Sequence, residues 1–208
     1  MNDYRPVYPG NADAGEIEIL HEEVAWANRV ARVLNDRVRF PGRKDGGQVE
    51  GDQFRLDHAP DKDHGVVIAP ILEDGHSLLL VHQFRHPVRI WTREFPRGAR
   101  ERGESPEEAA ARELKEELGC NVIRTFPLGR VTSDSGQQTG VPFLLAAIVR
   151  EAGARQQEAT EAISGTCRYT FSALHEACVR GDIVDSFTLC AVLRLSPWFV
   201  GDRLEPPE

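Results

Sequence analysis

Residues 98–120 read GARERGESPEEAAARELKEELGC, and this stretch decides the fold. Ser105 opens an S-x-x-E capping box, which satisfies free backbone amides at the start of a helix. Pro106 suits the first helical position, and Gly119 suits the left-handed residue at which many helices end. The sequence therefore predicts a helix over residues 106–118.

The predicted helix gathers three glutamates on one face: Glu113, Glu116 and Glu117. Like charges at these spacings destabilise a helix by roughly 0.2–0.5 kcal/mol per pair, and Arg112 offsets part of that cost by reaching Glu116. One interpretation is a solvated acidic surface, which is how most runs of charge are explained. The other is a site for a hard divalent cation such as Mg²⁺, which prefers carboxylate oxygens. The helix alone fits both interpretations.

The residues before the helix decide between these interpretations. The pattern G-x5-E-x7-R-E-U-x-E-E-x-G, in which U is a bulky aliphatic residue, is matched at every fixed position from Gly98 to Gly119. A chance match in a chain of this length is expected on the order of once in a million. The stretch resembles the signature of the Nudix hydrolase family. The signature's final aliphatic position is the one departure, where Cys120, a small hydrophobe, can replace the aliphatic side chain.

Three further runs resemble one group within this family, the ADP-ribose and nucleoside-diphosphate-sugar pyrophosphatases. Residues 83–87 (QFRHP) and 94–98 (EFPRG) are similar to the Q-[FY]-R-x-P and E-x-P-x-G runs of that group. Residues 181–188 (GDIVDSFT) are similar to its G-x-I-x-D-x-x-T run. The similarity extends over about residues 22–196.

The resemblance implies hydrolysis of a nucleoside diphosphate linked to another group, with Mg²⁺ as cofactor and Mn²⁺ as a substitute. In such enzymes the metal polarises a phosphoryl oxygen and lowers the pKa of the attacking water. Arg112 is expected to orient the ligands, and a backbone carbonyl at Arg97 or Gly98 to complete the coordination. The metal ligands implied are the carboxylates of the box helix, Glu113, Glu116 and Glu117.

The resemblance also implies which side chains bind the substrate. Arg85 is expected to clamp the diphosphate, the alternative being a surface arginine on a strand, and Glu94 is expected to contact the nucleotide or its ribose. Trp26 and Phe40 are candidates to hold the base, with structural packing as the alternative role for each. The expected substrate-binding residues are Gln83, Arg85, Glu94, Arg97, Gln137 and Trp26.

The general base is where the sequence departs from its relatives. Many ADP-ribose pyrophosphatases carry a glutamate in an S-P-G-x-x-x-E run after the box, whereas residues 133–139 (SDSGQQT) contain none. A second family position lies in an acidic loop, matched here by residues 156–161 (QQEATE). Glu161 or Glu158 is therefore expected to be either the base or a solvated loop charge. The pair Gln137-Gln138 is a candidate for reading a different sugar or base.

Strand signals outside the helix predict an α/β (α+β) fold. Apolar runs at residues 65–71 and 77–84 flank a Glu-Asp-Gly turn, which predicts a hairpin. Strands with helices between them indicate a sandwich, and the resemblance implies the α/β/α arrangement around a mixed central sheet. Further strands are expected at 141–149 and 167–171, and further helices at 172–180 and 186–195.

Short β-prone pieces broken by glycine and proline predict a small antiparallel β-module before the main domain. In ADP-ribose-type relatives such a module packs across a two-fold axis, so the resemblance implies a homodimer. The expected division is a flexible N-terminus at 1–16, the dimerising β-module at 17–58, the hydrolase domain at 59–200 and a disordered tail at 201–208.

Composition argues against several other classes of partner. A formal net charge of −8 is a poor match for DNA or RNA, and no apolar run approaches a membrane span. Residues 1–15 lack the regions of a signal peptide, and the four cysteines contain no CxxC pair. These features are typical of a cytoplasmic protein with reduced thiols.

The leading hypothesis is hydrolysis of ADP-ribose or a related nucleoside diphosphate sugar to a nucleoside monophosphate and a sugar phosphate. Other substrates considered are GDP-mannose, a dinucleoside polyphosphate and NADH. A different class of function is a Nudix module that senses a nucleotide without cleaving it, and the missing post-box glutamate motivates this alternative.

Overall fold

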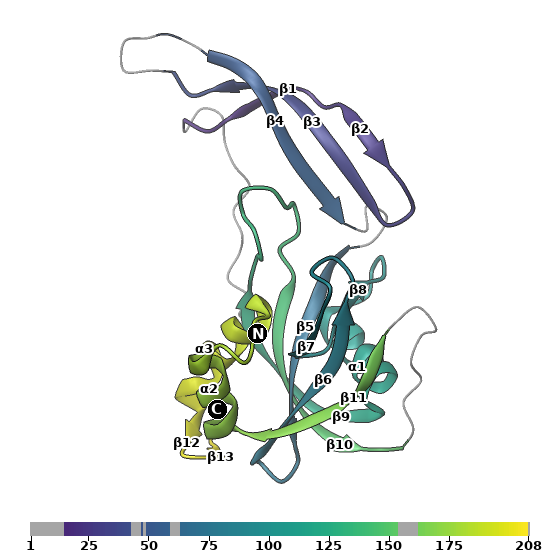
Figure 1. The fold of residues 1–208 in the computed structure, drawn as a ribbon, viewed down its shortest axis with the longest axis vertical. Coiled ribbons are helices and arrows are strands. Elements are labelled where there is room, and N and C mark those ends of the chain that lie inside the picture. Colours follow the sequence, from purple (N-terminus) through teal and green to yellow (C-terminus); the bar gives the residue numbers. More distant parts are fainter. Residues whose placement is uncertain (1–14, 43–46, 48, 59–62, 154–161, 208) are drawn as a thin grey trace.

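The structure, a computed structural model, describes residues 15–42, 47, 49–58, 63–153 and 162–207. Figure 1 shows a sheet from the N-terminal part of the chain at the top and a larger body of strands and helices below it. The N-terminal sheet is antiparallel, with β3 pairing β1 and β2 along one edge and β4 along the other. Its strands are β1 (Glu18–His21), β2 (Val24–Ala27), β3 (Ala31–Phe40) and β4 (Val49–His58).

The larger body is built on a seven-stranded mixed sheet. Strands β11, β6, β5, β10 and β9 lie in that order, while β7 pairs with β6 and β8 pairs with β5. The pair β5–β10 is parallel and the other pairs are antiparallel. The strands are β5 (Asp63–Leu72), β6 (Ser77–Arg85), β7 (Ile90–Glu94), β8 (Arg97–Arg100), β9 (Cys120–Arg130), β10 (Phe143–Glu151) and β11 (Ile163–Thr170).

Helices cover both faces of this sheet. Because side chains alternate along a strand, Val67 and Ile71 of β5 enter one core cluster and Val66 and Ile68 enter another. The first cluster includes apolar residues of α2 and α3, and the second includes those of α1. This arrangement confirms the predicted α/β/α sandwich with a mixed sheet. The helices are α1 (Pro106–Leu118), α2 (Phe171–Arg180) and α3 (Ser186–Leu195).

The predicted helices agree well with the structure because their ends carry strong local signals. The bounds of α1 and α3 are those predicted, and a short 3-10 turn (Ser196–Trp198) follows α3 at the proline. Helix α2 begins one residue earlier than expected, at Phe171, because Thr170 caps it by accepting a hydrogen bond from the Ala173 amide. No helix in the described ranges is long and apolar enough to cross a membrane.

Strand β9 was not predicted from the sequence. It is long, but Pro127 and Gly129 interrupt it, and its pairing with β10 is irregular at that point. Proline and glycine weaken a strand and are tolerated at such bulges. The strand forms because β10 beside it is apolar from Phe143 to Val149 and is paired along both edges.

Residues 201–207 differ from the disordered tail that the sequence predicted. Strands β12 (Phe199–Val200) and β13 (Arg203–Leu204) form a small antiparallel pair. Asp202 accepts a hydrogen bond from the Ser172 amide at 2.7 Å, and the ring of Phe199 stacks on that of Phe171 at 4.4 Å. These contacts tie the polar end of the chain to the start of α2, and composition alone does not reveal them.

Strand β4 also reaches the larger body. The Leu56 amide donates to the Gln137 carbonyl at 2.7 Å, and the Thr139 amide donates to the Leu56 carbonyl at 3.1 Å. Leu56 and Gln138 thus form a parallel β-bridge between the N-terminal sheet and the loop that joins β9 to β10. This bridge brings the end of β4 to the candidate site.

Candidate active site

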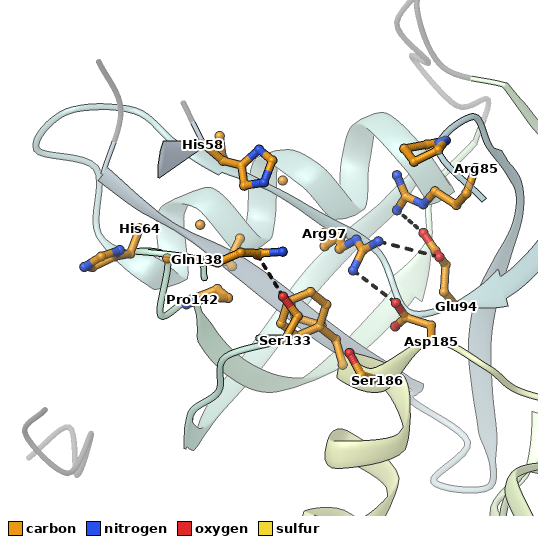
Figure 2. A pocket seen from close by; sticks show the side chains of 18 of the residues that line it. His58, His64, Arg85, Glu94, Arg97, Ser133, Gln138, Pro142, Asp185 and Ser186 are labelled. Carbon is orange, nitrogen blue, oxygen red and sulfur yellow. Dashed lines mark hydrogen bonds and ion pairs between the residues drawn. The ribbon is translucent and has the colours of Figure 1, made fainter. Parts of the chain in front are cut away.

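A pocket of about 1290 Å³ lies where the end of β4 meets the larger body. Figure 2 shows Arg85, Glu94 and Arg97 at one side of it, and Gln138 and His58 at the other. Its walls come from β4, the start of β5, the β6–β7 hairpin, β8, the β9–β10 loop and the residues around the start of α3. The main polar lining residues are Arg55, Asp57, His58, Arg85, Glu94, Arg97, Ser133, Gln138 and Asp185.

Glu94 holds two arginines at the pocket wall. Its side chain is only 1% exposed, and its carboxylate pairs with Arg85 and lies 3.8 Å from Arg97. The Thr92 hydroxyl donates a hydrogen bond to it at 3.0 Å. A buried carboxylate with these partners is satisfied within the protein. Glu94 therefore holds the guanidinium groups of Arg85 and Arg97 at this side of the pocket.

Two residues of the run at 181–188 connect this wall to the start of α3 through hydrogen bonds. Asp185 is the N-cap of α3 and accepts from both the amide and the hydroxyl of Thr188, at 2.9 and 2.8 Å. The second oxygen of Asp185 accepts from Arg97 at 3.1 Å. Thr188 is fully buried and accepts from the Phe95 amide at 2.9 Å. One helix cap thus fixes both the backbone and an arginine of the pocket.

Arg112 of α1 connects the helix by hydrogen bonds to the residues that precede it. Its guanidinium donates two hydrogen bonds to Glu104, at 3.0 and 3.1 Å, and one to the Ala99 carbonyl at 3.0 Å. These bonds hold the pKa of the Glu104 carboxyl below its usual range, and Glu104 in turn raises the pKa of Arg112. The same guanidinium donates to Glu113 at 2.7 Å and to Glu116 at 3.3 Å.

The carboxylate of Glu113 lies directly against Gly98, which lines the pocket. A Cβ atom at Gly98 would come within 1.8 Å of Glu113 Oε1, so only glycine leaves room for this approach. Glu113 and Glu117 are 7% and 3% exposed, and Glu116 is partly buried. Within the described ranges, no three acidic, histidine or cysteine side chains converge around one point as metal ligands do. The carboxylate oxygens of these glutamates, with the backbone of Gly98 beside Glu113, nevertheless suit a hard divalent cation.

Other expected substrate-binding residues lie outside the pocket lining. Gln83 is buried in β6, and Trp26 is 53% exposed on β2. Gln137 has an exposed side chain, and its backbone carbonyl is used in the bridge to β4. Glu158 and Glu161, the two candidates for the general base, lie outside the described residues.

Sequence reasoning assigned no role to several groups that line the pocket. Asp185 carried a signal, because it occupies a fixed position of the 181–188 run. Asp57 and His58 carried none, because they reach the pocket only through the bridge between β4 and the β9–β10 loop. Gln138 and Gln137 were both expected as candidates for reading the sugar or the base, and the sequence does not distinguish between them.

The fold and the site define an α/β/α domain with a carboxylate-bearing helix beside an arginine-lined pocket. The family model of the NUDIX domain matches residues 62–183, more than half of the chain. The chain belongs to the Nudix family, and together with the relatives below this match identifies a Nudix pyrophosphohydrolase.

Individual proteins agree with this assignment. The ADP-ribose pyrophosphatase of Mycobacterium tuberculosis is 29% identical over 182 residues, which are 86% of this chain and 82% of that protein. The ADP-sugar pyrophosphatase of Mus musculus is 47% identical over 57 residues, 26% of each protein. A crystal structure of an ADP compounds hydrolase superposes with a TM-score of 0.71 at 20% identity, over 88% of this chain and 94% of that one, which supports the fold.

Proposed function

We propose that the chain hydrolyses the diphosphate bond of ADP-ribose or a related nucleoside diphosphate sugar, giving a nucleoside monophosphate and a sugar phosphate. The observation that carries this proposal is the pocket wall on which buried Glu94 holds Arg85 and Arg97. That wall adjoins Gly98 and, behind it, the carboxylate of Glu113 on the box helix. The names of the relatives support an ADP sugar as the substrate class.

In this proposal Arg85 and Arg97 bind the diphosphate. The formal net charge of the chain is −8, so a diphosphate needs local positive charge, and guanidinium groups match phosphate oxygens in geometry and charge. Glu94 and Asp185 hold the two guanidinium groups in place before the substrate arrives. Arginines that are already ordered lose less conformational entropy on binding.

We further propose that Glu113, Glu116 and Glu117 hold Mg²⁺, with Mn²⁺ as a substitute. When bound, the cation supplies polarisation of a phosphoryl oxygen and a lower pKa for the attacking water. Arg112 orients two of the three carboxylates through its hydrogen bonds to Glu113 and Glu116. Glu104 holds Arg112 from the opposite side.

For the general base we propose Glu161 or Glu158, on the sequence pattern alone, because residues 133–139 contain no glutamate. General bases contribute about 10²–10⁴-fold to a rate. Kinetics of Glu161→Gln and Glu158→Gln decide between them: the base is the one whose loss lowers kcat by about that factor with little change in KM. Full activity in both variants would exclude this assignment.

The decisive experiment is a turnover assay with Mg²⁺ or Mn²⁺ on ADP-ribose, ADP-glucose, GDP-mannose, NADH and diadenosine polyphosphates. We expect the highest kcat/KM on an ADP sugar and no turnover in excess chelator. Glu117→Gln should lower kcat by about 10³-fold, because a lost ligand weakens both the metal and the attacking water. Glu107→Gln, which removes the same charge from the first turn of α1, is the matched control.

Near-normal turnover by Glu117→Gln would refute the proposed metal site. A highest kcat/KM on GDP-mannose, NADH or a dinucleoside polyphosphate would refute the proposed substrate class. Tight binding of ADP-ribose without hydrolysis of any compound would refute the proposed activity.

A further inference from the structure

We propose that Gln138 determines specificity by donating a hydrogen bond from its side-chain amide to an acceptor on one of the two groups joined by the substrate's diphosphate. This inference rests on the proposed function and adds a residue to its binding site. The acceptor is a hydroxyl or ring oxygen of the sugar, or a ring nitrogen or carbonyl of the base.

The first observation is the orientation of the amide. The Ser133 hydroxyl donates to Gln138 Oε1 at 2.9 Å, so the oxygen end of the amide is held by the protein. Figure 2 shows the nitrogen end of the amide on the side of Gln138 that faces Arg97. An amide nitrogen has two N–H donors and no acceptor capacity. It therefore presents donors alone to whatever fills the pocket.

The second observation is that the backbone of this loop is fixed on both sides of Gln138. The residue before it accepts from Leu56, the residue after it donates to Leu56, and the Gln138 amide itself donates to the Asp134 carbonyl at 3.0 Å. The Thr139 hydroxyl adds a hydrogen bond to Asp57 of β4 at 3.0 Å. Asp57 is in turn held by Arg32 at 2.6 Å.

A side chain on such a backbone is already positioned for binding, which is the condition under which one hydrogen bond discriminates between ligands. Gln137 does not meet this condition. Its side chain is exposed, it is absent from the pocket lining, and its carbonyl faces Leu56. Of the two adjacent glutamines, the geometry therefore selects Gln138.

The position of Gln138 also separates its role from that of the arginines. Arg85 and Arg97 are fixed by Glu94 and Asp185 on the larger body, whereas Gln138 is fixed against β4. A diphosphate bound to the arginines leaves one of its attached groups on the β4 side of the pocket. That group meets the amide donors of Gln138.

The test compares the wild type with Gln138→Leu, which keeps a similar volume and removes the hydrogen bond. KM and kcat are measured on two series of substrates. In one series the sugar varies and adenine is constant (ADP-ribose, ADP-glucose, ADP-mannose). In the other the base varies and the sugar is constant (ADP-glucose, GDP-glucose, UDP-glucose). Ser135→Ala, an exposed residue of the same loop, is the control.

We expect Gln138→Leu to raise KM by about tenfold on the preferred substrate with little change in kcat, since one neutral hydrogen bond is lost. The differences in kcat/KM between substrates should disappear in one series and persist in the other. The series in which they disappear identifies the sugar or the base as the group to which Gln138 donates. Ser133→Ala should give a smaller change of the same kind, and Ser133→Thr, which keeps the hydroxyl, should retain the wild-type preference.

Unchanged discrimination in both series would overturn the inference, as would a larger effect from Gln137→Ala than from Gln138→Leu. If the wild type hydrolyses none of these compounds, the proposed function fails independently of Gln138. Titration calorimetry with ADP-ribose then decides the role of Gln138: binding weakened about tenfold by Gln138→Leu supports it, and equal binding refutes it.

Discussion

At the position of Gly98 a side chain has no room unless Glu113 moves, because a Cβ atom would lie 1.8 Å from Glu113 Oε1 and 2.0 Å from its carboxyl carbon. The backbone of this glycine has no positive φ, so its role is to allow the close approach of Glu113. The sequence pattern identified Gly98 as a fixed position, and the structure supplies a physical reason for it.

We therefore predict that Gly98→Ala lowers kcat/KM by at least about 100-fold, because a displacement near 1 Å at a catalytic group can cost that much. Steady-state kinetics measure the loss, and circular dichroism checks that the variant is folded. Gly165→Ala is the control, since a Cβ atom there meets nothing within 4 Å. Equal activity of the two variants would show that Glu113 need not lie against Gly98.

At the scale of elements, the helices whose ends have local signals were predictable. The capping box and the closing glycine of α1 are visible in the sequence and are both formed. Strand β9 was not predicted because its stability comes from pairing with β10. The residues of β9 by themselves do not indicate that pairing. Propensity reports local preferences, and tertiary pairing overrides them.

The caps of α2 and α3 allow a matched comparison. Asp185→Ala removes the cap of α3 and the partner of Arg97, and Thr170→Ala removes the cap of α2, away from the pocket lining. We expect each substitution to lower the free energy of unfolding by about 1 kcal/mol. Urea denaturation measures this change.

Only Asp185→Ala should also raise KM, because it releases an arginine of the pocket wall. Steady-state kinetics on both variants provide the comparison. A similar rise in KM for Thr170→Ala would mean that loss of a cap by itself disturbs the site.

At the scale of the whole molecule, the N-terminal sheet carries apolar side chains that are exposed in the part of the chain that the structure describes. Val24 and Trp26 of β2 are 51% and 53% exposed, and Ile19 of β1 is 50% exposed. Exposed apolar groups gathered on one sheet are typical of interaction surfaces. Together with the homodimer that the sequence resemblance implies, they lead us to propose that the chain forms a homodimer through this module.

We predict that sedimentation velocity finds a dimer for the wild type and a monomer for Trp26→Asp, because a buried unpaired charge at an interface is costly. Val179→Asp, at a 74% exposed position on α2, should remain dimeric. A monomeric wild type, or dissociation caused equally by both variants, would contradict the role of the N-terminal sheet.

The sequence by itself determined the box helix, its glutamate-rich face and the family, because caps, helical periodicity and motif spacing are local properties of the chain. Only the tertiary structure decided how that helix meets the pocket and which other side chains take part. Gln138 and Asp57 lie 81 residues apart in the sequence and line one pocket because β4 bridges to the β9–β10 loop. Asp185 accepts a hydrogen bond from Arg97 because the start of α3 packs against the pocket residues of β8. Such contacts depend on how separate elements pack, and no local pattern specifies that packing.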